Sequence, residues 1–130
     1  MDEFVIDTHV LIWYFTDSRK LGRKASVALA AADSGQAIIH VPAIVIAELY
    51  YANVKNGYPI DFEEAFQTLE RSDQFAFTPF EASDVLDFGR DASASEMHDR
   101  MIVGVARRLG APLLTADRNI TASGLVEIVW

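Results

Sequence analysis

Short apolar runs alternate with helix-like segments along this chain, and that alternation constrains the fold more than any other feature. The apolar runs are expected to be strands at 4–7, 37–41, 75–78, 112–114 and 126–130. Strands that run parallel need long crossover connections, which helices usually supply. The pattern therefore predicts an α/β protein with a parallel sheet.

The segments between these runs carry helix signals. Asp7-Thr8 offers a cap-like start to a helix through Phe15, and Gly57 and Gly110 are suited to end two later helices. Further helices are expected over 22–32, 42–56, 61–71, 81–91 and 96–109. Helical chain thus lies between the expected strands, as parallel pairing requires.

Composition bounds the class of protein. At 130 residues, 51% of them hydrophobic, the chain fits one globular domain, residues 1–130, that buries roughly two thirds of its unfolded surface. The absence of cysteine excludes disulfides, Cys-ligated zinc, iron-sulfur clusters and thiol nucleophiles, and a cytoplasmic location is expected. The apolar N-terminus begins acidic and contains Asp7 and His9, unlike a signal peptide or a membrane span. We expect no membrane association.

The charge distribution limits the partners. A net charge of −8 argues against loose binding to polyanions, because nucleic-acid binders usually present a basic face. The basic residues are nevertheless unevenly placed, with clusters at Arg19, Lys20, Arg23 and Lys24 and at Arg100, Arg107 and Arg108. A local basic rim therefore stays open as a possibility.

Two carboxylates follow expected strands. Asp7 ends the run Phe4-Val5-Ile6, and Asp117 comes shortly after the run that ends at Leu114. In parallel α/β sheets the functional site lies beyond the carboxyl ends of the strands, at a topological switch point. Asp7 and Asp117 are therefore candidates for a common site.

Two further carboxylates lie on expected helices. Glu48 shares a helical face with apolar residues at spacings of one, three and four positions, where an unpaired charge would cost several kcal/mol. Asp99 opens a helix, in the turn that favours negative charge. Clustered carboxylates repel one another, and a divalent cation is the usual remedy, so these acids indicate a metal-dependent enzyme.

Each acid also has a purely structural interpretation. Asp7, Asp99 and Asp117 are suited to cap helices, and Glu48 could pair with a basic side chain such as Arg100. One shared metal site explains all four acids at once, whereas the structural interpretation needs four separate reasons.

Polar neighbours accompany these acids. His9 and His98 each lie beside a candidate ligand but point about 100° away on a helix, which favours an orienting role over metal ligation. Thr115 and Asn119 flank Asp117 with neutral oxygens that could orient a carboxylate, or could serve the turn and the cap.

Aromatic pairs occur on two expected helices, at Trp13-Tyr14 and Tyr50-Tyr51. Such side chains can stack on nucleic-acid bases, but aromatics beside an apolar stripe more often belong to the core or to a subunit interface. We expect the core or interface role here.

The segments that contain the four acids resemble the motifs of one known family. The opening Val5-Ile6-Asp7-Thr8-His9-Val10-Leu11-Ile12-Trp13 is similar to the first motif of the PIN-domain ribonucleases of the VapC toxin type. The later motifs of that family are matched, in the same order, by Ile46-Ala47-Glu48-Leu49, His98-Asp99-Arg100-Met101-Ile102 and Leu113-Leu114-Thr115-Ala116-Asp117-Arg118-Asn119-Ile120. One departure is Glu96-Met97-His98-Asp99, where many relatives carry Asp-Pro-Phe-Asp.

The resemblance implies a fold and an activity. The fold would be a small parallel β-sheet sandwiched by α-helices, with an acidic pocket that binds Mg²⁺ or Mn²⁺ and hydrolyses RNA phosphodiesters. Asp7, Glu48 and Asp99 would form the innermost catalytic and metal-binding group, completed by Asp117. The resemblance also implies a homodimer restrained by a cognate antitoxin.

Two other functions compete with this interpretation. A phospho-acceptor receiver domain would need an Asp after the third strand and a Lys near its last strands, but Thr78-Pro79 follows the third expected strand and no Lys occurs after Lys55. A catalytically inactive PIN-fold module that binds RNA or protein is the stronger alternative, because fold analogy alone does not establish activity.

Overall fold

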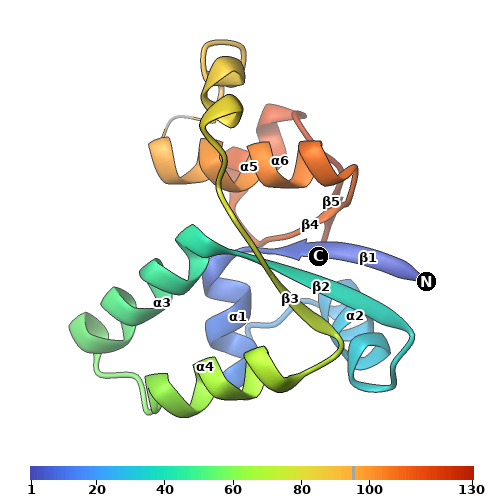
Figure 1. Ribbon diagram of the computed structural model, residues 1–130, viewed down its shortest axis with the longest axis vertical. Coiled ribbons are helices and arrows are strands. Elements are labelled where there is room, and N and C mark those ends of the chain that lie inside the picture. Colours follow the sequence, from blue (N-terminus) through green and yellow to red (C-terminus); the bar gives the residue numbers. More distant parts are fainter. Residues whose placement is uncertain (95) are drawn as a thin grey trace.

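The computed structural model describes residues 1–94 and 96–130, and these form one α/β unit around a parallel sheet (Figure 1). Every strand pair in the sheet is parallel, and the strand order is β3-β2-β1-β4-β5. The strands are β1 (Asp2–Ile6), β2 (Ala37–Pro42), β3 (Phe75–Thr78), β4 (Leu113–Leu114) and β5 (Ile128–Val129). The predicted fold class is confirmed.

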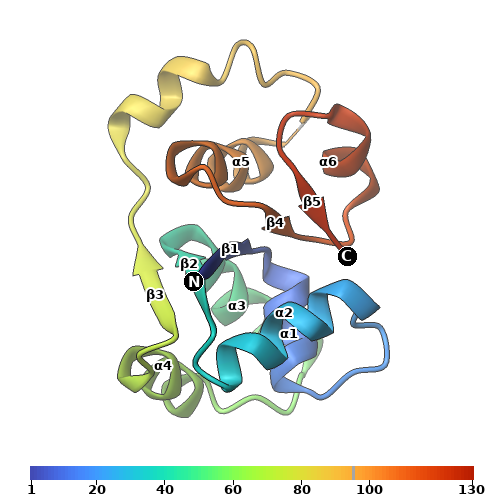
Figure 2. The ribbon, with the colours of Figure 1, turned by 90° about the vertical axis from the view of Figure 1, so that its right-hand side faces the viewer.

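Helices cover both faces of the sheet. The helices α1 to α4 lie on one face, and α5 and α6 lie on the other (Figures 1 and 2). Their bounds are α1 (Thr8–Phe15), α2 (Arg23–Asp33), α3 (Ala43–Asn56), α4 (Phe62–Arg71), α5 (Met97–Leu109) and α6 (Arg118–Ser123). None of these helices, in the part of the chain that the structure describes, has the length and apolar character needed to cross a membrane.

Local sequence signals explain most helix ends. Gly57 and Gly110 end α3 and α5 in the left-handed region, with φ of 64° and 62°, where a residue without Cβ is favoured. Asp61 caps α4 by accepting a hydrogen bond from the amide of Glu64. Gly22 is the residue before α2 rather than part of it.

The prediction of a helix over 81–91 is wrong. The segment forms only a short 3₁₀ helix, η1 (Ala82–Asp87), followed by turns. Its apolar side chains Val85 and Leu86 are exposed, so no apolar stripe holds a longer helix against the sheet. The short helix α6 was not predicted, and it begins where Asp117 caps it.

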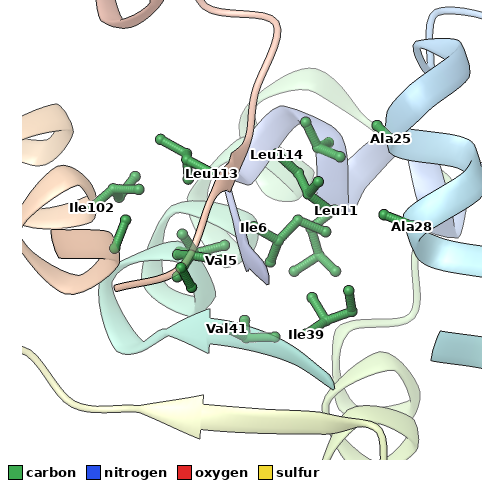
Figure 3. Packing of buried hydrophobic residues seen from close by; sticks show 14 of the residues in the cluster. Val5, Ile6, Leu11, Ala25, Ala28, Ile39, Val41, Ile102, Leu113 and Leu114 are labelled. Atoms are coloured by element: carbon green, nitrogen blue, oxygen red, sulfur yellow. The ribbon is translucent and has the colours of Figure 1, made fainter. Parts of the chain in front are cut away.

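The core fills the space between the sheet and both helical layers. Successive strand residues point to opposite faces. Ile6 and Leu114 therefore lie toward α1 and α2, near Leu11 and Ala28, whereas Val5 and its neighbours lie toward α5 (Figure 3). Burial on both faces accounts for strands that read as continuous apolar runs.

The chain order reverses at the centre of the sheet. From β1 the chain proceeds to β2 and β3 on one side, and it then returns to β4 and β5 on the other side. The carboxyl ends of β1 and β4 therefore flank the topological switch point, where open α/β sheets place their ligands. Asp7 follows β1 directly and Thr115 follows β4 directly.

Candidate active site

A cavity of about 480 Å³ opens at the switch point, between residues of α3 and α5. In Figure 1, α3 and α5 both begin near the end of the sheet to which β1 points. The structure brings all four predicted acids to this cavity, and its polar lining consists of Asp7, Thr8, His9, Glu48, Tyr51, Glu96, His98, Asp99 and Asp117. Acids whose positions span 7 to 117 in the sequence thus converge, as the sequence predicts.

Asp7 is the most deeply buried of the four acids. Its side chain caps α1, and the residue is only 7% exposed. Oδ1 accepts a hydrogen bond from the amide of Thr8 at 2.7 Å, and Oδ2 accepts one from the hydroxyl of Thr115 at 2.6 Å. Burial raises the pKa of Asp7, against these hydrogen bonds, and the charge of Glu48 raises it further. The helix-cap role and the position in the cavity therefore coexist.

Glu48 reaches the cavity from the first half of α3. Its Oε1 accepts a hydrogen bond from the Thr8 hydroxyl at 2.7 Å, and its Oε2 lies 3.2 Å from Nδ1 of His98. The structural alternative of a basic partner for Glu48 is met by His98 and not by Arg100, whose guanidinium donates instead to the backbone carbonyls of Ala94 and Phe88. His98 thus takes the orienting position expected of it.

Asp99 lies in the first turn of α5 and faces the other acids. Burial raises its pKa to about 6, helped by the negative charges of Asp117, Asp7, Glu96 and Glu48 in decreasing order. Among the described residues, no donor forms a hydrogen bond to its carboxylate. Burial and the neighbouring acids therefore disfavour the charged form of Asp99, and no hydrogen bond from a described residue stabilises it.

Asp117 caps α6 and lines the cavity at the same time. Its Oδ1 accepts hydrogen bonds from the amides of Asn119 at 2.8 Å and Ile120 at 2.9 Å. Its own amide donates to the hydroxyl of Thr115 at 3.0 Å, the same hydroxyl that donates to Asp7. Thr115 thus connects the two acids at the strand ends.

The four acids have little basic compensation among the residues that the structure describes. Within residues 1–94 and 96–130, neither Lys nor Arg forms an ion pair with any of the four acids, and His98 is the single basic neighbour at ion-pair distance. Several carboxylates close together in a partly buried cavity favour the binding of cations.

The carboxylate oxygens that line the cavity are of the chemical type that binds hard divalent ions. Carboxylate oxygens are the ligands that Mg²⁺ and Mn²⁺ prefer. In the described part of the chain, however, no three His, Asp or Glu side chains already form a cluster that could hold an ion. The oxygens of Asp7 and Glu48 accept hydrogen bonds from Thr8 and Thr115, but a carboxylate oxygen that accepts one such bond keeps a lone pair for a metal.

Two lining residues were not recognised as parts of the site. Thr8 bridges Asp7 and Glu48, and its position directly after a strand-end acid was the available signal. Tyr51 is 72% exposed at the cavity, so of the expected core or interface roles the core role is wrong for it, and the interface role stays a prediction. Its spacing of three residues from Glu48 places it on the same face of α3.

Comparisons with known proteins agree with this architecture. The model of the PIN domain family matches residues 4–123. Mycobacterium tuberculosis VapC20, described as a Sarcin-Ricin loop cleaving toxin, superposes with a TM-score of 0.71 at 14% identity, over 98% of this chain and 99% of that one. VapBC2 from Rickettsia felis, described as bound to a DNA fragment from its promoter, gives 0.67 at 16% identity, over 97% and 96%.

A third structure, FitAcB from Neisseria gonorrhoeae, gives a TM-score of 0.64 at 16% identity, over 96% of this chain and 95% of that one. The search of curated proteins produced no match. The structural likenesses establish the fold, and the family match extends over most of the sequence and includes all four acids. The chain belongs to the PIN domain family.

Proposed function

We propose that this protein is a metal-dependent endoribonuclease, with the acidic cavity as its active site, and that it acts as the toxin of a toxin-antitoxin pair. One observation carries the proposal: Asp7, Glu48, Asp99 and Asp117 come from separate elements and line one cavity without a Lys or Arg partner among the described residues. Membership of the PIN domain family and the fold shared with VapC20 support it.

The chain's own residues have distinct tasks in this proposal. Asp7, Glu48 and Asp99 hold Mg²⁺ or Mn²⁺, and Asp117 completes the ligand set. When bound, such an ion stabilises the charge that develops on the phosphate and makes water a stronger nucleophile. Thr8 and Thr115 fix the carboxylates of Glu48 and Asp7 by donating hydrogen bonds to them.

A partner protein is proposed for the same cavity. A cognate antitoxin that presents Arg or Lys to the four acids would compete with the metal, because either cation relieves the same repulsion. Coexpression with the neighbouring reading frame is expected to give a complex that does not cleave RNA, and substitution of the inserted basic residue is expected to restore cleavage.

A homodimer is likewise proposed, and sedimentation of the purified chain tests it. Monomeric behaviour at all accessible concentrations would contradict the dimer.

One observation favours a second candidate function. Because the described acids do not already form a metal cluster, the fold could serve as an inactive module that binds RNA or protein. Such a module would bind its partner equally well with and without divalent ions.

The test is cleavage of mixed-sequence RNA by purified protein. Activity is expected with Mn²⁺ or Mg²⁺, none with EDTA, and none from Asp7→Asn. Asp73→Asn is the matched control, since it makes the same chemical change at an exposed position just before β3, at the amino ends of the strands and away from the cavity. Full activity in the metal-stripped protein would refute the mechanism, and inactivity under all metal conditions would favour the binding module.

A further inference from the structure

A second hollow, of about 710 Å³, lies next to the acidic cavity and has a different chemistry. Its lining includes two tryptophans and two cationic side chains: Trp13 of α1, Lys20 of the α1–α2 connection, Arg118 of α6 and Trp130. In Figure 2 the C-terminal end of the chain lies beside β4, between α6 and the α1–α2 segment. The proposed catalytic mechanism uses none of these four side chains.

The hollow adjoins the acidic cavity along a shared wall. Thr115 lines the hollow and donates its hydroxyl to Asp7, and Arg118 lines the hollow next to Asp117, which lines the cavity. On α1, His9 faces the cavity, and its ring centroid lies 5.8 Å from that of Trp13. An RNA strand that leaves the acidic cavity over this wall would therefore enter the hollow.

The two indoles are held in fixed positions. Their ring centroids are 5.6 Å apart with the planes tilted by 52°, and both side chains are half-buried. A Cβ atom at Gly22 would lie 2.6 Å from Cε2 of Trp130, so the indole packs directly on backbone that lacks a side chain. Indoles fixed in this way offer stacking surface at small entropic cost.

The cations of the hollow are available to a ligand. Lys20 and Arg118 are exposed, and in the described part of the chain neither forms an ion pair. By contrast, Arg107 and Arg108 are engaged by carboxylates of the chain itself. In a protein with a net charge of −8, unpaired cations beside an acidic active site provide attraction for a polyanion where it is otherwise lacking.

We propose that this hollow binds the single-stranded RNA next to the cleaved phosphodiester, with a base stacked on Trp13 or Trp130 and backbone phosphates contacted by Lys20 and Arg118. The proposal rests on the proposed ribonuclease function and assigns the flanking contacts of its substrate. Aromatic stacking combined with phosphate-binding cations is how single strands are held with little dependence on sequence. A peptide segment would use the indoles but would gain less from the two cations that line the hollow, so RNA is the favoured occupant.

The two tryptophans provide a direct optical readout, because the chain contains no others. Asp7→Asn protein in EDTA is titrated with a mixed-sequence 12-nucleotide RNA while tryptophan emission is recorded. A fluorescein-labelled copy of the same RNA gives the affinity by anisotropy in parallel. We expect saturable quenching with the same midpoint as the anisotropy change.

Charge-neutralising variants test the cations. A plot of log affinity against log salt has a negative slope, and Lys20→Gln and Arg118→Gln are each expected to make it shallower by roughly 0.7. This is the value for one lost phosphate contact with a single strand. Arg71→Gln is the matched control, an exposed arginine at the end of α4 without an ion pair among the described residues, and it should leave the slope unchanged. Trp13→Leu or Trp130→Leu should weaken binding by roughly 5-fold to 150-fold.

The outcomes separate this proposal from the proposed function. RNA binding with unchanged tryptophan emission, or equal salt slopes in the three Gln variants, overturns the flanking site even if Mn²⁺-dependent cleavage occurs. If the Lys20 and Arg118 variants lose binding of the coexpressed antitoxin but retain their affinity for RNA, the hollow belongs to a protein partner. That result overturns the flanking RNA site too. Quenching and altered slopes without cleavage under any metal condition support the RNA site and contradict the nuclease. If the Trp variants fail to fold, the exposed Lys20 and Arg118 still decide the outcome.

Discussion

The carboxylates at the two ends of α5 differ in whether an arginine pairs with them. At its C-terminal end, Arg107 donates two hydrogen bonds to Asp91, at 2.8 and 2.6 Å, and Arg108 donates to Asp84 at 3.2 Å. At its N-terminal end, Asp99 faces the negative charges of four other acids, with neither Lys nor Arg in ion-pair contact among the described residues. The same helix therefore borders one neutralised acidic cluster and one that is left negative.

The difference separates ion-paired structural acids from the acids to which we assign a metal-binding role in the proposed function. Asp91 is fully buried, and a buried carboxylate is tolerated when its partner is in place. Asp7 is nearly as buried, at 7% exposure, and has only neutral hydrogen-bond donors. We infer that the first cluster anchors the 79–94 segment to α5, whereas the proposed function assigns to the second a cation from outside the chain.

Breaking the neutralised cluster should have the largest effect on stability. Arg107→Met leaves Asp91 buried without its bidentate partner, and we expect a loss of about 3–5 kcal/mol in unfolding free energy. Urea denaturation at neutral pH measures it. The double variant Arg107→Met with Asp91→Leu should recover most of the loss, because it removes the unpaired charge. A loss below about 1 kcal/mol in the single variant would show that the pair contributes no anchoring.

The corresponding change in the acidic cavity should have the opposite stability effect. Asp7→Asn retains a helix cap but removes one repelling charge, so the metal-free protein should be equally or more stable. RNA cleavage should fall at least about 100-fold, because metal stabilisation of the transition state amounts to several kcal/mol. Calorimetry and a cleavage assay on the same sample measure both. Unfolding of the variant would instead assign Asp7 to the cap alone.

Thr115 tests the support of the site. Thr115→Val keeps the shape of the side chain but removes the hydroxyl that donates to Asp7 at 2.6 Å and accepts from the amide of Asp117. We expect a loss of roughly 10-fold to 100-fold in Mn²⁺ affinity, the usual cost of losing such a supporting contact. Isothermal titration with Mn²⁺ measures it, and Thr68→Val on α4 is the control. Unchanged affinity would leave Thr115 as a turn residue only.

A change of pH should have the smallest effect of these four tests on the unfolding free energy. The pKa of Asp99 is about 6 in the folded chain against an ordinary value of 3.8. Between these values the folded state holds more protons than the unfolded state, so unfolding free energy decreases as the pH rises through that window. The melting temperature in EDTA should therefore fall more between pH 5 and pH 7 for wild type than for Asp99→Asn. Parallel profiles would contradict the raised pKa that burial and the neighbouring acids give Asp99.

The strand positions and the convergence of the four acids could be predicted from the sequence. Apolar runs identify buried strands locally, and the parallel topology then places Asp7 and Asp117 at one edge. The ion pairs of α5 could not be predicted, because nothing local shows that Arg107 reaches Asp91 or that Arg100 bonds to backbone carbonyls. The predicted helix over 81–91 is wrong for the same reason: long-range ion pairs, not an apolar face, hold this segment.

The contact between Thr8 and Glu48 could not be predicted from the sequence either, because it depends on tertiary packing. Its hydroxyl meets Glu48 only because α1 and α3 pack side by side, 40 positions apart in sequence. The hollow around Trp13 and Trp130 joins residues from the two ends of the chain, which no local pattern reveals.

The most direct test of the account is the stabilisation of the protein by Mn²⁺. If the cavity is left negative in order to bind a cation, the unfolding free energy of wild type should rise by about 2.7 kcal/mol at 100 times the dissociation constant. Asp7→Asn should gain much less, while Arg107→Met, although less stable, should gain as much as wild type. Equal gains in wild type and Asp7→Asn, or no gain in wild type, would contradict the claim that these four acids form a cation site.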